Sequence, residues 1–275
     1  MKSVQRILVY IDEAEHARFL VEKALRLKHY ADALLYFVQP IDDVLEDAQM
    51  PCSDEEREQI IRQLEGIKFV HRPERTWEDI ISTAHRLACD LIVKDAFVEK
   101  RLNKIVHTAH DWDLLRHADV SVMMIKPKPW VEGSNIVAAI DVFDSYKHAL
   151  NVHVLRYAGS LAELLGGQMH VVNAVPPLRG VVLEHATVAA YERRVHEVEA
   201  QRHDVIQRLL SESEACCAEI HVVEGVPGDA VNELVNTLEA ECLVIGKVSR
   251  SVQNFMDTTA ELLLHVVSSD VVFVV

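Results

Sequence analysis

Short runs of apolar residues alternate along the chain with longer segments in which apolar residues recur every three or four positions. Runs such as "RILVYID" (6–12) and "ECLVIGK" (241–247) are typical of strands that helices cover on both faces of a parallel sheet. Segments such as "DIISTAHRLA" (79–88) and "DAVNELVNTLEA" (229–240) are typical of amphipathic helices. The alternation predicts an α/β fold with a doubly wound parallel sheet.

This order of strands and helices occurs twice. The matching pairs are "RILVYID" (6–12) with "NIVAAID" (135–141), "CDLIVKD" (89–95) with "ECLVIGK" (241–247), and "DWDLLRHADVSVMMI" (111–125) with "AELLLHVVSSDVVFVV" (260–275). We therefore predict two tandem domains, 1–128 and 133–275, each with a five-stranded parallel sheet, joined by a segment that contains prolines and glycine. We expect the copies to pack with pseudo-twofold symmetry through their last strands, Val122–Ile125 and Val271–Val275, because pairing removes two exposed sheet edges.

One predicted helix is unusually long for a domain of this size. Residues 184–210 form a single amphipathic segment of roughly 40 Å at the usual helical rise. Its apolar stripe consists of Val188, Tyr191, Val195, Val198, Val205 and Leu209. We expect this helix to contact the other domain or a partner subunit.

Composition limits the classes of partner. The net charge is −15, which argues against non-specific binding of nucleic acid or anionic membranes. No apolar run approaches the ~20 residues of a membrane-spanning helix, and the N-terminal segment lacks the pattern of a secretory signal. The five cysteines form no CxxC pair, so we expect free thiols and a cytoplasmic location without membrane insertion.

Four features together resemble the universal stress protein family. These are a first strand that ends in Asp, the late strand "LVIG", a loop that reaches "FMDTTAE" and the terminal strand "VVFVV". With "HDWDLLRHADVSVMMIKPKPW", the chain is most similar to the tandem, UspE-like members. The resemblance implies two domains of the adenine nucleotide alpha hydrolase-like fold and a role in stress survival.

The resemblance also implies where a nucleotide would bind. ATP-binding members wrap the phosphates with G-x-x-G, about nine residues, and then G-[ST]. In the second copy Gly246 matches the first glycine, Ser249 replaces the second, and Asp257 and Thr258 replace the last pair, in a loop that is two residues short. Ser and Asp cannot bring the backbone as close to an anion as glycine can. We expect a degenerate site, at which Lys247, Arg250 and Thr258 could still hold a phosphate.

The first copy departs further from that pattern. Its corresponding loop, "KDAFVEKRLNKIVHTAHD" (94–111), contains no glycine, and Asp95 stands at the position of Gly246. We expect no ATP binding there. The aspartate at the end of the first strand, Asp12 or Asp141, would lie beside the base in nucleotide-binding members. Capping of the following helix is the alternative that we favour at both positions.

No catalytic or metal-binding motif is visible. The sequence contains no HExxH, Walker loop, nucleotide-binding GxGxxG or ordered Ser-His-Asp set, so we predict a protein without enzymatic activity. His107 and His110 could share a metal with Asp111, but the sequence supplies no convincing further ligand, and His185, His196 and His203 fall on a polar helix face. We expect neither a metal nor a cofactor.

Two functional classes remain. The leading hypothesis is a non-catalytic binding or scaffold module that acts in the stress response through an unidentified protein partner or small ligand, with a homodimer left open. The alternative is a regulator that binds ATP or AMP, or a weak ATPase, acting through Asp141, Gly246 and the loop of the second domain.

Overall fold

A computed structural model gives the structure of the protein. It describes residues 4–11, 17–38, 67–70, 76–96, 109–175, 188–215, 218–247, 263 and 267–275. Several residues singled out above lie outside this part of the chain, namely Asp12, His107, His185, Ser249, Arg250, Asp257 and Thr258.

Each half of the chain alternates strands and helices, as predicted. The first half contains β1 (Arg6–Tyr10), α1 (Ala17–Ala31), β2 (Leu34–Phe37), β3 (Lys68–Phe69), α4 (Trp77–Leu87), β4 (Leu91–Asp95), α5 (Ala109–His117) and β5 (Ser121–Ile125). The second contains β6 (Ile136–Ala139), the 3₁₀ turn η2 (Ser145–Lys147), α6 (His148–Leu165), β7 (Met169–Val175), α7 (Val188–Ser213), β8 (Ala218–Glu224), α8 (Pro227–Thr237), β9 (Cys242–Gly246) and β10 (Asp270–Val274).

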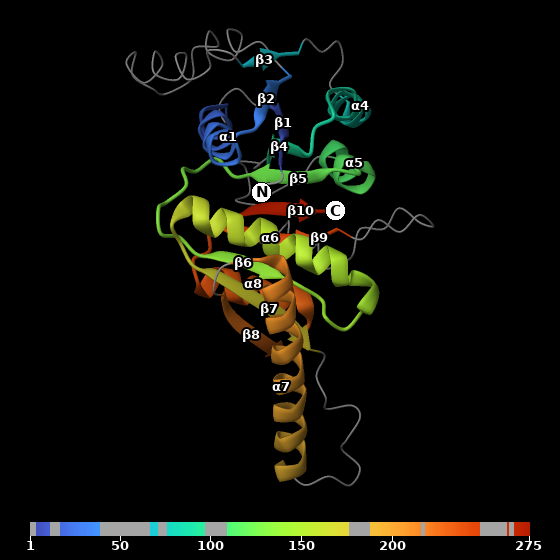
Figure 1. Ribbon diagram of the computed structural model, residues 1–275, viewed down its shortest axis with the longest axis vertical. Coiled ribbons are helices and arrows are strands. Elements are labelled where there is room, and N and C mark those ends of the chain that lie inside the picture. The colour runs from blue at the N-terminus through green and yellow to red at the C-terminus, as the bar shows by residue number, and fades with distance from the viewer. Residues whose placement is uncertain are drawn as a thin grey trace.

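The strands form one ten-stranded sheet in the order β3-β2-β1-β4-β5-β10-β9-β6-β7-β8. Every pairing within a half is parallel, and the two halves meet where β5 and β10 pair antiparallel, with Met123 opposite Val272 (Figure 1). The predicted packing through the last strands is therefore confirmed. Because the two halves run in opposite directions, the carboxyl ends of their strands lie at opposite edges of the sheet.

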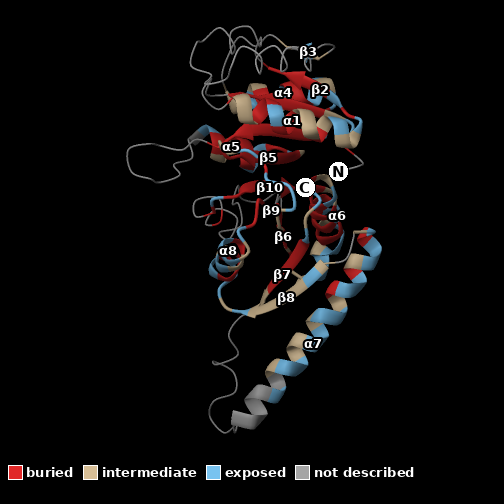
Figure 2. Ribbon diagram, turned by 90° about the vertical axis from the view of Figure 1, so that its left-hand side faces the viewer, coloured by how far each residue is buried: buried red, intermediate tan, exposed pale blue. Residues whose placement is uncertain are grey.

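Helices cover both faces of this sheet, which explains why its strands are apolar at successive positions (Figure 2). On one face α1, α6 and α7 pack over a core that includes Leu20, Leu155 and Ile206. On the other face α4, α5 and α8 pack over a second core, which includes Leu114 and Val231. Each core continues from one domain into the other. The seam between the domains, where β5 pairs with β10, is therefore part of the hydrophobic interior.

Local signals in the sequence mark the ends of these helices. The Thr76 side chain accepts a hydrogen bond of 3.3 Å from the Asp79 N–H and caps α4. Gly166 ends α6 in the left-handed conformation with φ of 62°, which glycine adopts without the steric cost that a side chain brings. Thr76 therefore fixes where α4 begins, and Gly166 fixes where α6 ends.

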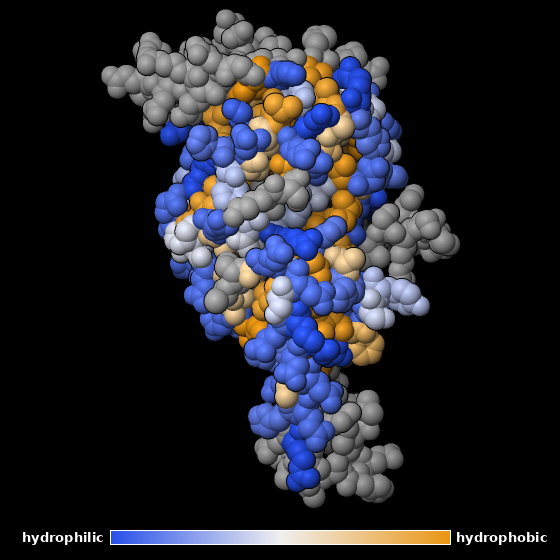
Figure 3. Space-filling view, viewed as in Figure 1, coloured by the Kyte–Doolittle hydropathy of each residue, from blue (hydrophilic) through white to orange (hydrophobic). Residues whose placement is uncertain are grey.

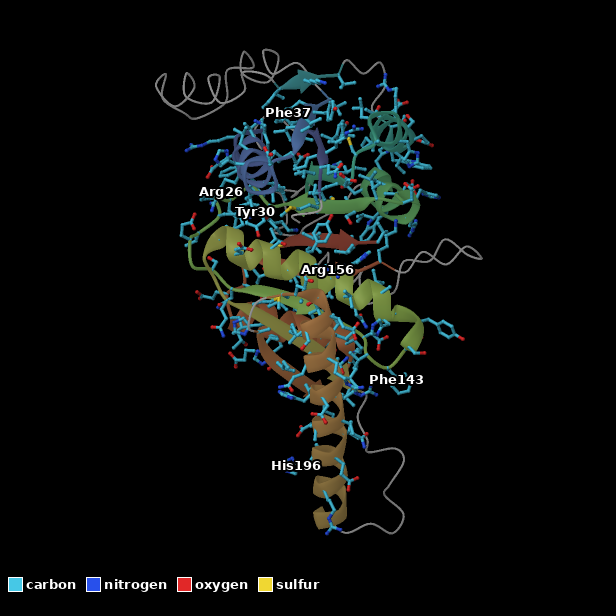
Figure 4. All side chains as sticks on the ribbon, viewed as in Figure 1. Arg26, Tyr30, Phe37, Phe143, Arg156 and His196 are labelled. Carbon is cyan, nitrogen blue, oxygen red and sulfur yellow. The ribbon has the colours of Figure 1, made fainter. Side chains whose placement is uncertain are left out.

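A buried carboxylate ties the domains together at the seam. Asp270, at the start of β10, accepts hydrogen bonds from the Lys23 ammonium of α1 (2.7 Å), the Lys126 N–H (2.7 Å) and the Trp130 indole N–H (2.6 Å). On the same side of the sheet, Arg26 and Tyr30 project from α1, and the Tyr30 hydroxyl donates to Glu163 of α6 at 2.7 Å (Figure 4). The first domain, the linker and the second domain thus share one polar network.

Within the described residues the long helix α7 runs from Val188 to Ser213, and it ends three residues later than predicted. Its C-terminal half packs on α6 and β8, where Ile206 and Leu209 are buried, whereas Val195 and Val198 are only half-buried. Its N-terminal half extends beyond the sheet and presents a hydrophilic surface in Figure 3. We expected α7 to contact the other domain or a partner subunit, but among the described residues it packs mainly on α6 and β8 of its own domain, and β8 is the edge strand farthest from the first domain. A contact with a partner subunit stays a prediction.

Candidate functional site

The predicted site residues that the structure describes lie at the carboxyl end of the second domain's parallel strands. Asp141 follows β6, Gly246 ends β9, and Lys247 comes directly after it. β6 and β9 are neighbours in the sheet, so their ends meet at one edge, where ligands bind in open α/β folds. The topology therefore brings these three residues to the same edge.

Asp141 is held by groups of its own loop. One carboxylate oxygen accepts the Phe143 N–H at 2.9 Å, and the other accepts the Lys147 ammonium at 2.8 Å. Burial acts to raise the pKa of this carboxyl, but the Lys147 and Phe143 hydrogen bonds and the charge of Arg202 outweigh it, so the pKa is lowered. The cap of the following helical turn is made by Asp144, which accepts the Tyr146 N–H at 3.0 Å. The capping role expected for Asp141 thus belongs to Asp144, and Asp141 closes a tighter turn two residues long.

Gly246 lies where α6 approaches the end of β9. A Cβ atom at this position would be 2.8 Å from Cγ and Cδ2 of Leu150, closer than normal van der Waals contact. A side chain here would force Leu150 to move, so packing between strand and helix favours glycine even without a ligand. The resemblance to the first glycine of a phosphate loop and the packing requirement coincide at one residue.

Lys247 is directed at the first domain. Its side chain is buried, and its ammonium donates a hydrogen bond to the Ala118 carbonyl, just after α5. Burial lowers the pKa of Lys247 to about 8, although the nearby Asp119 carboxylate acts to raise it. The lysine that we expected as a phosphate ligand makes a contact across the domain seam.

In the first domain, the strand register places Asp95 at the position of Gly246. Ile7 pairs with Leu91 as Ile136 pairs with Cys242, and four residues further along these two strands stand Asp95 and Gly246. Asp95 is buried, so a carboxylate occupies the point where a phosphate loop would begin.

A buried ion pair lies beside Asp95. The Lys94 ammonium is 2.7 Å from the Asp111 carboxylate of α5 and 5.7 Å from the centre of the Tyr10 ring. Lys126 is also buried there, and burial lowers its pKa to about 8, while Asp270 and Asp111 act to raise it and Lys128 to lower it. The carboxyl end of this domain therefore holds charges of both signs that neutralise one another.

The histidines give a different picture from the one expected. His107 lies outside the described residues, His110 is exposed, and Asp111 is committed to Lys94. The structure instead brings together His170 of β7 with Glu219 and His221 of β8, whose ligand atoms all lie within 4.8 Å of one another. The sequence shows Glu219 and His221 two residues apart in "EIH" and His170 in "QMH". That these three side chains meet depends on the register of β7 and β8, which the sequence does not reveal.

Comparison with known proteins supports the family resemblance. The family model for the universal stress protein family matches residues 3–126 and 134–274. Universal stress protein E of Escherichia coli K12 is 28% identical over 192 residues, which are 67% of this chain and 58% of that protein. The homolog of Haemophilus influenzae is 29% identical over 188 residues, which are 65% of this chain and 59% of that protein. The chain thus matches less than two thirds of the length of these relatives.

Solved structures agree with the fold. A protein of unknown function from Pseudomonas aeruginosa PAO1 is 23% identical, with a TM-score of 0.76 over 99% of this chain and 93% of that one. A universal stress protein from Archaeoglobus fulgidus is 16% identical, with a TM-score of 0.63 over 99% and 98% of the two chains. Among the described residues, none of the helices has the length and apolar character needed to cross a bilayer. The family model covers nearly all of both copies, and the chain belongs to the universal stress protein family.

Proposed function

We propose that this chain is a non-catalytic binding or scaffold module of the cytoplasmic stress response, with nucleotide sites that are degenerate in both domains. The observation that carries the proposal is the position of Lys247, whose ammonium donates to the Ala118 carbonyl of the other domain. A lysine next to a phosphate loop contributes to binding only if its charge reaches the anion. Here that charge is buried in the seam, and reaching a phosphate would break a buried hydrogen bond.

The surroundings of Asp141 support the same interpretation. A carboxylate that is to hydrogen-bond a nucleotide must have free acceptor positions facing the ligand. Both oxygens of Asp141 accept hydrogen bonds from the loop that follows it, one from Phe143 and one from Lys147. Each oxygen keeps one further lone pair, but a ligand would have to share the carboxylate with the charge-assisted bond from Lys147, which is among the stronger hydrogen bonds in proteins.

The first domain supports the proposal through its charges. Asp95 stands where the first loop glycine would be, and the Lys94 ammonium is neutralised by Asp111 at 2.7 Å. A phosphate placed at the end of β4 would meet the Asp95 and Asp111 carboxylates, and Lys94 would have to exchange one anion for another. We therefore expect the first domain to contribute packing at the seam and not a nucleotide site.

A binding role is favoured by exposed aromatic residues beside Asp141. Phe143 is 79% exposed and Tyr146 is 96% exposed, although side chains of this size are usually at least half-buried. Phe143 projects from the margin of the second domain (Figure 4), and the Arg202 guanidinium of α7 lies 5.2 Å from its ring centre. Aromatic residues and arginine are enriched in protein–protein interfaces. The partner expected is a protein or small ligand that contacts these rings, and a second copy of the chain would satisfy the same chemistry.

The proposal is tested by measuring nucleotide binding directly. We expect titration calorimetry with MgATP and with AMP to detect no binding in the micromolar range, and millimolar ATP to raise the melting temperature only slightly. A ligand at a hundredfold excess over its Kd would add ~2.7 kcal/mol to the stability, which a thermal scan detects easily. The matched control is the double variant Ser249→Gly and Asp257→Gly, which should regain at most weak binding because the loop stays two residues short.

The alternative function has its own signature. Mass spectrometry of small molecules released from the purified protein would recover ATP or AMP from a nucleotide-binding regulator. Recovered nucleotide, or a micromolar affinity of the unmodified protein for ATP, would overturn the scaffold proposal. An apolar ligand, or a protein partner whose binding is lost in Phe143→Ser, would support it.

A further inference from the structure

Three side chains with metal-binding atoms converge on one face of the outer strands of the second domain. Glu219 and His221 are two residues apart on β8, so both project from the same face of the sheet. His170 on β7 stands directly opposite Glu219 in the parallel register. This face is the one covered by α8, and the group lies near the amino ends of the strands, away from Asp141 and Gly246 at their carboxyl ends.

The distances between the ligand atoms fit one shared cation. His170 Nδ1 is 3.1 Å from His221 Nε2 and 3.6 Å from a carboxylate oxygen of Glu219, and His221 Nε2 is 3.9 Å from the other oxygen. Two ligands bound to zinc at ~2.0–2.1 Å with a tetrahedral angle between them are about 3.4 Å apart. The observed spacings lie on both sides of that value. The imidazole planes are tilted by 30° with centroids 5.3 Å apart, so the rings meet through their nitrogens.

A further residue sets the tautomer of His170. The amide NH₂ of Asn135 donates to the Leu238 carbonyl at 2.9 Å, which leaves the Asn135 carbonyl oxygen facing His170. Only a protonated Nε2 of His170 can donate to that oxygen, at 3.3 Å, so in neutral His170 the lone pair is on Nδ1. Histidines that bind metals usually donate their other ring N–H in this way to a carbonyl or carboxylate.

Solvent reaches the group from one side. The side chain of His170 is 4% exposed, that of His221 20% and that of Glu219 57%. A cation could therefore enter past Glu219, displace water, and leave a fourth position for water or for a group from outside the chain. Two imidazoles and one carboxylate suit zinc and its neighbours in the transition series far better than magnesium or calcium.

We propose that His170, Glu219 and His221 form a binding site for a divalent transition-metal cation, with zinc as the best-suited ion. The site joins the edge strand β8 to β7 and is independent of the scaffold function proposed above. Its effect on the protein is to fasten the edge of the sheet against which α7 packs, because a ligand that binds only the folded state stabilises it.

Titration of the full-length, chelator-stripped protein with zinc chloride tests the site. We expect binding of one zinc ion per chain at this site and a rise in melting temperature. His221→Gln should weaken zinc binding by at least about a hundredfold, because it removes a direct ligand, whereas loss of a group that only hydrogen-bonds to a ligand costs about 10–100-fold. In the Co²⁺-loaded protein we expect visible absorption bands typical of tetrahedral coordination, and His221→Gln should abolish them. Circular dichroism establishes that each variant is folded.

The matched control is another histidine–glutamate contact. His196 projects from the exposed half of α7 (Figure 4), and its Nδ1 is 3.3 Å from Glu199 without a second imidazole among the contacts of the pair. His196→Gln should leave zinc affinity unchanged. If the unmodified protein does not bind zinc, or if folded His221→Gln retains the affinity and the cobalt spectrum, the proposal is wrong. Glu219→Gln, at a side chain that is 57% exposed, provides a second variant that should also weaken zinc binding.

Discussion

Gly246 illustrates how a single residue can satisfy a family pattern and a packing constraint together. Because a Cβ atom there would lie 2.8 Å from Leu150, we expect Gly246→Ala to lower the free energy of unfolding by about 1–3 kcal/mol, the usual cost of overpacking, and Gly246→Val by more. Chemical denaturation without nucleotide measures this effect. In a Leu150→Ala background the same substitution should cost much less, and equal costs in both backgrounds would contradict a steric origin.

Lys247 should leave a mark on the pH dependence of stability. Its pKa falls from 10.5 to about 8 in the folded protein, so between these values the unfolded chain binds more protons and stability rises with pH. In Lys247→Met this contribution is absent. The difference in unfolding free energy, unmodified minus variant, should therefore increase by up to about 3 kcal/mol between pH 8 and 10.5.

Urea denaturation across that pH range measures the difference. Lys126 has its pKa lowered to about 8 as well, so the variant should retain part of the rise. A difference that stays constant with pH would mean that the pKa of Lys247 is the same in the folded and the unfolded protein. A difference that decreases would mean that its ammonium gains more from Ala118 and Asp119 than burial costs.

Sequence reasoning located these residues but not their contacts. The internal repeat placed Asp141 and Gly246 at strand ends, because strand ends follow from hydrophobic pattern and local turns. The direction of Lys247 depends on the antiparallel seam between β5 and β10, which brings Ala118 close from 129 residues away along the chain. The partner of a side chain at a domain seam is set by tertiary packing, which no local pattern records.

At the scale of elements, α7 shows that an apolar stripe in the sequence does not by itself tell which part of a helix is buried. The predicted stripe contained Val195 and Val198, but the domain offers a packing surface only to the C-terminal half, where Ile206 and Leu209 are buried. The hydrophobic period predicted the helix and most of its length correctly. The part of α7 that becomes buried depends on where β8 and α6 end. The sequence pattern of α7 does not contain that information.

This difference between the two halves of α7 is measurable. Leu209→Ala removes a side chain that is 2% exposed and should destabilise the protein by about 2–5 kcal/mol, as large-to-small substitutions in cores do. Val198→Ala, on the projecting part of the same helix, should change stability by less than about 1 kcal/mol. Thermal and urea denaturation of both variants give the comparison. A large loss in Val198→Ala that grows with dilution would reveal a partner subunit covering the projecting part.

For the whole molecule, the seam is nearly symmetric in shape and asymmetric in charge. Lys23 of α1 and Tyr157 of α6 occupy equivalent places in their helices, one residue before the buried Ala24 and Ala158. Each contacts the first residue of the opposite domain's last strand. Lys23 pairs with Asp270 at 2.7 Å, whereas Tyr157 hydrogen-bonds to Ser121, and burial raises the pKa of Tyr157 to about 12. The repeat predicted the twofold pairing of strands, but this divergence within it became visible only in three dimensions.

The asymmetry predicts which side of the seam carries more of the coupling between the domains. Asp270→Ala would leave the Lys23 ammonium, 1% exposed, without its carboxylate, and breaking a buried ion pair from one side costs about 3–5 kcal/mol. Ser121→Ala removes one neutral hydrogen bond at the equivalent position and should cost about 0.5–1.5 kcal/mol. Urea denaturation, followed by probes in each domain, measures both losses.

In Asp270→Ala the two domains should also begin to unfold separately, because Lys23, Trp130 and the Lys126 backbone lose their common acceptor. The double variant Lys23→Met and Asp270→Leu removes both charges and should recover only the part of the loss that comes from the unpaired Lys23 charge, because the Trp130 and Lys126 N–H groups still lack an acceptor. Equal losses in Asp270→Ala and Ser121→Ala, with the domains still unfolding together, would show that the apolar cores on either face of the sheet join the two copies without help from this network.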